Sequence, residues 1–135
     1  MQRKIYTTEL GGKTLTAEFN DLATHANGSV LITYGETVIL VTAVMGKENP
    51  GLNYFPLSVE FEEKFYAAGE ILGSRFMRRE GRPSDEAVLS ARIVDRTIRP
   101  LFPPTLRTEV QVVITVLSIG EDDPDVLGVI GASLA

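Results

Sequence analysis

The sequence predicts an α+β fold in which a β-sheet packs against helices. Three observations indicate this: paired runs of β-type residues joined by glycines, a helix pattern bounded by Ser84 and Pro100, and a long apolar strand followed by a second helix. An order of hairpins, helix, strand and helix is typical of layered α+β domains. With 135 residues, 44% of them hydrophobic, the chain suits one domain with a real core.

The first half of the chain predicts two β-hairpins and a further strand. IYTTEL and TLTAEF flank LGGK, so Gly11 and Gly12 are expected in a turn. SVLITY and TVILVTAVM flank Gly35-Glu36, and the second run is apolar enough to be a central strand. LSVEFEE alternates as a strand does, and residues 65–83 follow as a long irregular connection.

Strong boundary signals predict a helix from Ser84 to about Arg99. Ser84 suits the N-cap position, two acidic residues follow in the positive first turn, and Pro100 ends the helix. EVQVVITVLSI predicts a strand and GEDDP a turn, and Pro124 opens a second helix, DVLGVIGASLA. Because the chain stops inside this apolar helix, we expect a fragment of a larger protein.

The acidic total charge hides a basic segment. The net charge is -5, yet residues 75–107 hold eight arginines and four acids, so this segment carries +4 and the remainder -9. A local patch sets the local potential, and the planar guanidinium suits phosphate oxygens. A polyanionic partner is therefore compatible with the acidic total.

Composition also predicts a cytoplasmic protein. The chain has no cysteine, and its start, MQRKIYTTEL, has no apolar signal segment. The longest apolar run is about half the length that a membrane helix needs. We therefore expect a soluble protein without disulfides and without a membrane partner.

Three arginines of the predicted helix share one face. Arg92, Arg96 and Arg99 are spaced i, i+4 and i+7. A second face, expected toward the core, carries Ala87, Ala91, Val94 and Ile98, while Leu89 and Ile93 lie beyond the arginine stripe. Asp95 can pair with Arg92 or Arg99, but one aspartate cannot neutralise three arginines. A bound polyanion would supply the remaining charge.

The stretch GSRFMRREGRP before the helix adds Arg78, Arg79 and Arg82 beside Phe76 and Met77. Arginines next to an aromatic ring fit single-stranded nucleic acid, because the charges follow the phosphates and the ring stacks on a base. Structural interpretations stay open for both clusters: ion-pair decoration of a solvated helix face, and a structural turn.

Other candidate sites are weaker. His25, the single histidine, has no ligand-spaced partner, and we expect it to be structural. Asp122, Asp123 and Asp125 surround Pro124, so helix capping explains them better than a metal does. The sequence has no phosphate-binding Walker loop, no GxSxG and no HExxH, and no catalytic constellation can be drawn from it.

Three motifs resemble a known family: EEKFYAAG, RREGRPS and DRTIRPLFP. With the sequence around them, from about Thr8 to Ala135, they resemble the first RNase PH-like core of bacterial polynucleotide phosphorylases. The resemblance implies an RNase PH-like (ribosomal protein S5 domain 2-like) fold, with a mixed sheet packed against helices. Residues 1–135 are then expected to be that first core, truncated at its C-terminal end.

The resemblance also implies an activity for the full-length protein. Members degrade RNA from the 3′ end by phosphorolysis, with inorganic phosphate as co-substrate and nucleoside diphosphates as products. They form a homotrimeric ring and use Mg²⁺. The phosphate and metal residues lie in a second core, so this chain is expected to hold no catalytic or metal residue and to be inactive alone. RNA-degradation complexes are possible further partners.

For this chain, the resemblance implies that it binds RNA and forms part of the surface through which the ring assembles. The family's RNA-gripping loop places Phe76 and Met77 at two aromatic positions, and its basic positions and the helix arginines complete the expected RNA-binding set: Arg78, Arg79, Arg82, Arg92, Arg96 and Arg99. Three departures affect the loop and helix: Met77 replaces a phenylalanine, Arg75 accompanies an extra residue, and Thr97 replaces a proline.

Two alternatives accompany this prediction. One is a non-catalytic RNA-binding or scaffold subunit of an exosome-like ring. The other is a single-core RNase PH acting on tRNA ends, which the FYAAGEI and RREGRP stretches fit poorly.

Overall fold

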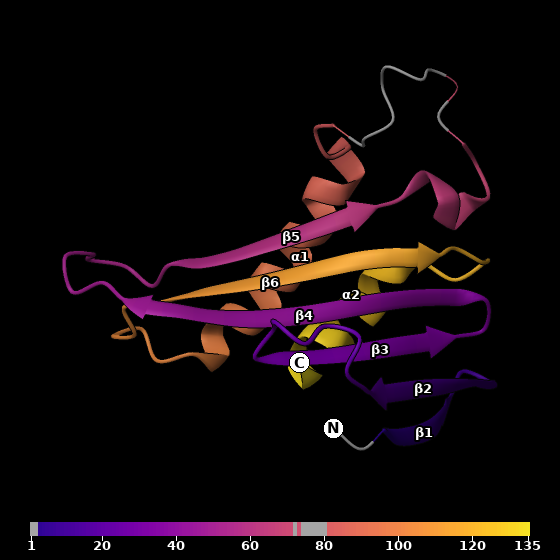
Figure 1. The fold of residues 1–135 in the computed structure, drawn as a ribbon, viewed down its shortest axis with the longest axis horizontal. Coiled ribbons are helices and arrows are strands. Elements are labelled where there is room, and N and C mark those ends of the chain that lie inside the picture. The colour runs from indigo at the N-terminus through magenta and orange to yellow at the C-terminus, as the bar shows by residue number, and fades with distance from the viewer. Residues whose placement is uncertain (1–2, 72, 74–80) are drawn as a thin grey trace.

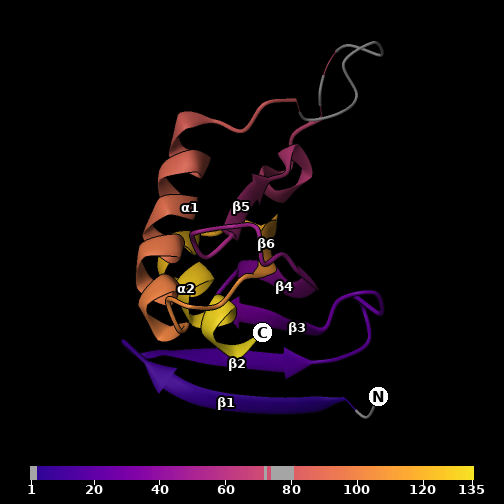
Figure 2. The same cartoon turned by 90° about the vertical axis from the view of Figure 1, so that its left-hand side faces the viewer.

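The computed structural model describes residues 3–71, 73 and 81–135. Within them, six strands form one sheet in the order β1-β2-β3-β4-β6-β5, and two helices lie against one face of it (Figure 1; Figure 2). The strands are β1 Lys4–Leu10, β2 Lys13–Phe19, β3 Gly28–Tyr34, β4 Thr37–Glu48, β5 Leu57–Glu63 and β6 Thr108–Ser118. The helices are α1 Asp85–Ile98 and α2 Pro124–Leu134, with short 3₁₀ turns η1 Phe65–Ala68 and η2 Arg99–Leu101.

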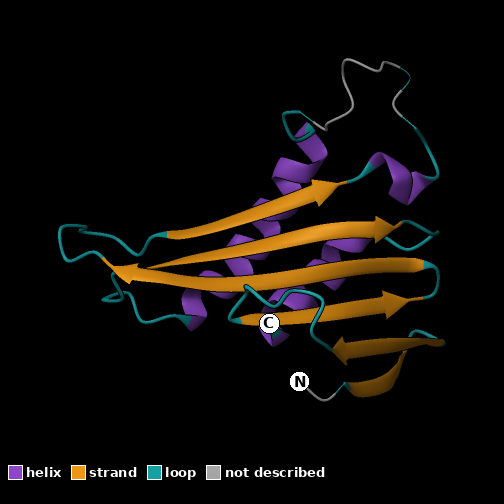
Figure 3. Cartoon of the chain, in the orientation of Figure 1, coloured by secondary structure: helices purple, strands orange, loops and turns teal. Residues whose placement is uncertain are grey.

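Both predicted hairpins are confirmed. β1 pairs with β2 and β3 with β4, each antiparallel. Gly11, Gly12 and Gly35 make the turns with φ of 58°, 82° and 58°, a left-handed conformation that glycine adopts without steric cost. β4 also pairs antiparallel with β6, whereas β5 runs parallel to β6. The sheet is therefore mixed, as the resemblance implied, and β5 lies at its edge (Figure 3).

The prediction of an irregular connection after β5 is wrong for the first residues of that segment. Phe65–Ala68 form a 3₁₀ turn, which Gly69 ends at a φ of 74°. Ala67 is buried, and its carbonyl accepts a hydrogen bond from the Ile119 N–H just after β6. A small residue and a glycine thus let the chain turn tightly against the sheet. Of the rest of this connection, residues 72 and 74–80 lie outside the described part of the chain.

The predicted helix starts are confirmed. Ser84 caps α1 by accepting a hydrogen bond from the Ala87 N–H, and Asp123 caps α2 by accepting one from the Asp125 N–H. Each side-chain oxygen satisfies a backbone donor that has no partner inside its helix. No helix among the described residues has the length and apolarity needed to cross a membrane.

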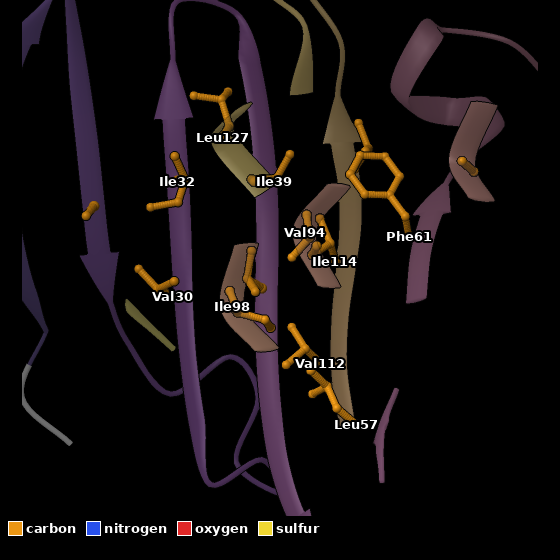
Figure 4. Packing of buried hydrophobic residues seen from close by; sticks show 14 of the residues in the cluster. Val30, Ile32, Ile39, Leu57, Phe61, Val94, Ile98, Val112, Ile114 and Leu127 are labelled. Atoms are coloured by element: carbon orange, nitrogen blue, oxygen red, sulfur yellow. The ribbon is translucent and has the colours of Figure 1, made fainter. Parts of the chain in front are cut away.

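The core fills the space between the sheet and the two helices (Figure 4). Its fully buried side chains include Ile32, Ile39, Val94 and Ile114. The predicted inner face of α1 is confirmed, because Ala87, Val94 and Ile98 are buried and Ala91 packs against them. The core therefore fixes which face of α1 points outward.

Candidate nucleic-acid interface

A groove of about 970 Å³ runs between α1 and the edge strand β5. The strand lies at the sheet edge, and the helix crosses obliquely behind it (Figure 1; Figure 2). The strand contributes residues 59–62, and Pro83 leads into the helix, whose contribution is Ala87, Val88, Leu89, Ala91, Arg92, Ile93, Asp95 and Arg96. The groove is therefore built from one sheet edge and one helix face.

The floor and the rim of the groove differ in character. Phe61 and Ala87 are buried on the floor, whereas Leu89 and Ile93 on the rim are 59% and 48% exposed. Leu89 and Ile93 were predicted to lie beyond the arginine stripe, and the structure confirms that they are separate from the core face. The groove thus presents apolar surface and guanidiniums together to solvent.

Hydrogen bonds close both ends of the groove. At one end, Ser84 Oγ donates to Glu63 Oε2 at 3.0 Å, which joins the start of α1 to the end of β5. At the other end, Arg99 Nη1 donates to the Phe55 carbonyl at 3.2 Å, and Nη2 donates to the Leu57 carbonyl at 3.1 Å. The helix and the strand are therefore joined at both ends of the groove.

Arg99 is also held by Asp95. Its Nε donates to Asp95 Oδ1 at 2.7 Å and its Nη2 to Oδ2 at 2.6 Å, a two-point contact across one helical turn. The hydrogen bond to Asp95 raises the pKa of Arg99 above its ordinary value, while burial acts in the opposite direction. Four of the five guanidinium N–H groups thus have partners within the protein.

Arg92 and Arg96 have a different environment. Both side chains are exposed and line the groove, and neither has an ion pair or hydrogen bond with any residue in the described ranges. The predicted stripe therefore divides: two arginines face the groove without a partner in the described part of the chain, and the third is bound to Asp95 and to the residues at the start of β5.

Two of the acidic residues that line the groove, Glu60 and Glu62, carry side chains on the face of β5 turned away from the helices. Successive strand residues face opposite sides of a sheet, and Leu57 and Phe61 face the helices, so Glu60 and Glu62 face the other side. There Glu60 accepts a hydrogen bond from Gln111 at 3.1 Å, and Glu62 pairs with Lys64 at 3.0 Å. Every acidic residue lining the groove, Asp95 included, is thus engaged elsewhere.

The structure bears only partly on the predicted RNA-binding loop. Arg82 is exposed just before Pro83, at the end of the groove where α1 begins. Phe76, Met77, Arg78 and Arg79 lie outside the described residues. Sequence reasoning missed the contribution of β5 to the groove, because no local pattern shows which strand a helix will cover.

The aspartates near Pro124 have structural explanations. Asp123 caps α2, as expected, and Asp122 pairs with Lys13 at 2.8 Å and thereby raises the pKa of that lysine. His25 is exposed in the turn before β3. Among the residues that the structure describes, no group of three or more His, Cys, Asp or Glu is placed to hold a metal ion.

Comparison with known proteins identifies the family. Residues 11–135 match the family described as "3' exoribonuclease family, domain 1". The chain belongs to this 3′ exoribonuclease family. Relatives that share its sequence include the "Polyribonucleotide nucleotidyltransferase" of Heliobacterium modesticaldum, 53% identical over 98% of this chain, and that of Deinococcus radiodurans, 56% identical over 98%. The chain spans 19% and 17% of those two relatives, about a fifth of their length. The resemblance drawn from EEKFYAAG, RREGRPS and DRTIRPLFP is confirmed.

Two solved structures share the architecture of this chain. Rice Rrp46 aligns with a TM-score of 0.56 and 14% identity over 98% of this chain and 56% of its own. A structure titled "Archaeal exosome core" aligns with a TM-score of 0.53 and 19% identity over 99% of this chain and 47% of its own. At these identities the likeness concerns the fold, and it confirms the predicted RNase PH-like α+β class.

Proposed function

We propose that this chain is part of a 3′-to-5′ exoribonuclease that degrades RNA by phosphorolysis, and that the α1–β5 groove holds single-stranded RNA. One observation carries the second part. Arg92 and Arg96 have no partner among the described residues, because every acid lining the groove is bound to another residue. Unpaired guanidiniums at a groove create a positive local potential, and RNA phosphates are anions that guanidiniums bind well. The names of the relatives support the first part.

The proposed binding mode uses charge and apolar surface together. Arg92 and Arg96 contact phosphates, while Leu89 and Ile93 offer apolar surface to bases. Phosphate contacts are independent of base sequence and sensitive to salt, which suits an enzyme that must accept any RNA. By resemblance, the loop residues Phe76, Met77, Arg78, Arg79 and Arg82 extend this grip.

The chemistry of phosphorolysis assigns this chain a positioning role. An oxygen of inorganic phosphate attacks the last phosphodiester, the bond to the 3′ oxygen of the preceding nucleotide breaks, and a nucleoside diphosphate leaves. A strand held in register brings that bond to the phosphate, and correct orientation lowers the barrier substantially. In this proposal the groove holds the RNA, and a second core binds the phosphate and the Mg²⁺; no step is assigned to Mg²⁺ in this chain.

The same proposal includes the assembly and the location. Residues 1–135 form the first RNase PH-like core of a homotrimeric ring, which acts in the cytoplasm and is open to RNA-degradation partners. The "Archaeal exosome core" title supports an assembly of such domains. The alternative, a scaffold subunit without turnover, has less support, because the relatives cited above carry an enzyme name.

An assay on poly(A) tests the proposal. The protein is incubated with poly(A), with and without inorganic phosphate, and the nucleotides are separated by chromatography. We expect ADP, formed only when phosphate is present. The 135-residue chain assayed alone is expected to bind poly(A) without releasing ADP. Formation of AMP regardless of phosphate would indicate hydrolysis and contradict the proposal, and binding without turnover by the whole protein would favour the scaffold alternative.

A further inference from the structure

Asp95 lies on α1 where more than one arginine could bind its carboxylate. Asp95 lines the groove and lies three residues after Arg92 and one before Arg96. Residues three apart on a helix are neighbours, so a side chain at Asp95 can turn toward the Arg92 guanidinium. Nevertheless, both of its oxygens are bound by Arg99, at 2.7 and 2.6 Å. A carboxylate that could occupy the groove arginines is thus held by a third arginine.

We infer that Arg99 is a positioning residue that binds the Asp95 carboxylate and so leaves Arg92 and Arg96 available to a polyanion. The inference rests on the proposed function, in which that polyanion is RNA. It differs from the sequence prediction that Arg99 itself contacts RNA.

The geometry explains why Asp95 binds Arg99 and not Arg92. Its contact with Asp95 is bidentate, which is the strongest arrangement for a guanidinium and a carboxylate. The carbonyls of Phe55 and Leu57 fix the same guanidinium from the other side, so little side-chain freedom is left to lose. Arg92 has no comparable anchor among the described residues. One N–H of Arg99 remains for any other partner, which argues against a main role in holding phosphate.

Removal of Arg99 should therefore release Asp95 toward Arg92. The released carboxylate would compete with a phosphate for the same guanidinium. Exposed ion pairs are weak, so we expect RNA affinity to fall by about two- to five-fold. If the effect arises from the carboxylate, Asp95→Asn in the same protein should reverse it, because a neutral amide cannot take the place of a phosphate.

The test compares three variants of the protein: Arg99→Gln, Arg99→Gln with Asp95→Asn, and Arg107→Gln. Arg107 is a matched control, because it also donates to backbone carbonyls, those of Pro104 and Leu106, and binds no carboxylate in the described structure. Affinity for a fluorescent oligo(A) is measured by anisotropy across a salt titration. We expect weaker binding for Arg99→Gln alone and recovery in the double variant. A double variant as weak as Arg99→Gln would show that Arg99 binds RNA itself or holds α1 in place, and would overturn the inference.

A second measurement needs no RNA. Phenylglyoxal modifies unpaired arginines, and peptide mass spectrometry reports the rate at Arg92. A helical ion pair should slow that rate by roughly two-fold in Arg99→Gln, and Asp95→Asn should restore it. Equal rates in these variants and the wild type would overturn the inference.

Asp95→Asn alone keeps the inference testable if Arg99→Gln does not fold. Arg99 already holds this carboxylate, so the single change should leave the Arg92 rate as in the wild type. A faster rate would mean that Asp95 already occupies Arg92, and would overturn the inference. Failure of the wild type to bind oligo(A) would instead contradict the proposed function, and the modification rates would still decide whether Arg99 holds Asp95 away from the groove.

Discussion

Ser84 joins Glu63 to the first turn of α1: its hydroxyl donates a 3.0 Å hydrogen bond to Glu63 Oε2 and accepts one of 3.0 Å from the Ala87 N–H. One side chain thus caps the helix and fixes it to the last residue of β5. The groove begins at this junction, so the cap also sets the distance between its two walls.

Replacing Ser84 should weaken the domain through the loss of this cap. For Ser84→Ala we expect the free energy of unfolding to fall by about 1 kcal/mol, because the Ala87 N–H loses its partner. Urea denaturation followed by circular dichroism measures the change. Ser84→Asn is the matched control, since its amide oxygen can accept the same hydrogen bond, and it should retain most of the stability. Equal loss in both variants would show that capping is not the cause.

Gly131 lies where α2 packs closely against the sheet. A Cβ at this position would lie 2.5 Å from Val41 Cγ2 and 3.3 Å from Ile32 Cγ1, and both neighbours are fully buried. Overpacking of this kind costs about 1–3 kcal/mol, more than the roughly 1 kcal/mol that alanine gains over glycine in a helix. We therefore expect Gly131→Ala to lower the melting temperature.

Gly128 provides the control in the same helix. There a Cβ would meet its nearest neighbours, the side chains of Ile114, Phe61 and Val94, at 3.4 to 3.5 Å. Gly128→Ala should therefore be close to neutral, since the helix gain offsets the tighter contact. Thermal denaturation measures the melting temperatures of both variants. Similar melting temperatures for Gly131→Ala and Gly128→Ala would contradict the packing explanation.

The features that sequence analysis predicted correctly are set by local chemistry. The N-cap of α1 depends on Ser84 and the residues directly after it, and the hairpin turns depend on glycines at left-handed positions. The inner face of α1 follows from 3.6-residue periodicity. Each of these signals lies within one turn or one element, so no tertiary contact was needed to interpret it.

The groove could not be predicted in the same way. Arg99 donates to the carbonyls of Phe55 and Leu57, which lie 44 and 42 residues earlier in the chain. Backbone carbonyls carry no sequence signal, and the helix spacing gave Arg92, Arg96 and Arg99 the same face. Only the packing of α1 on β5 distinguishes the bound arginine from the two that face the groove.

The first hairpin should loosen in acid. Arg3 and Asn20 donate hydrogen bonds to Glu18, and the bond from Arg3 is the main reason why the pKa of Glu18 is lowered from its ordinary value of 4.5. A carboxyl with a lowered pKa stabilises the fold above its ordinary value, and this stabilisation is lost as the pH falls through the lowered value. Below pH 4.5 we therefore expect the pairing of β1 with β2 to weaken progressively.

Proton NMR can follow this loss. The Tyr6 ring lies edge-on to Phe19 at 5.9 Å, so ring-current shifts of Tyr6 report the pairing of β1 with β2. In the wild type the shifts should move toward unfolded values as Glu18 is protonated. Glu18→Gln should show no such titration, and a titration that persists in that variant would assign the effect to another group.

Arg92 and Arg96 should account for part of the salt dependence of RNA binding. Each phosphate contact to a single strand contributes about 0.7 to the slope of log affinity against log salt concentration. Arg92→Ala with Arg96→Ala should therefore reduce that slope by roughly 1.4 and weaken binding to all base sequences alike. Arg107→Ala removes an arginine that is bonded to backbone carbonyls outside the groove, and should leave the slope near the wild-type value. Fluorescence anisotropy on oligo(A) and oligo(U) across a salt series measures both quantities. Equal slopes for the double variant and the wild type would mean that the two guanidiniums make no phosphate contact, and the groove would lose its proposed role even though the family assignment would stand.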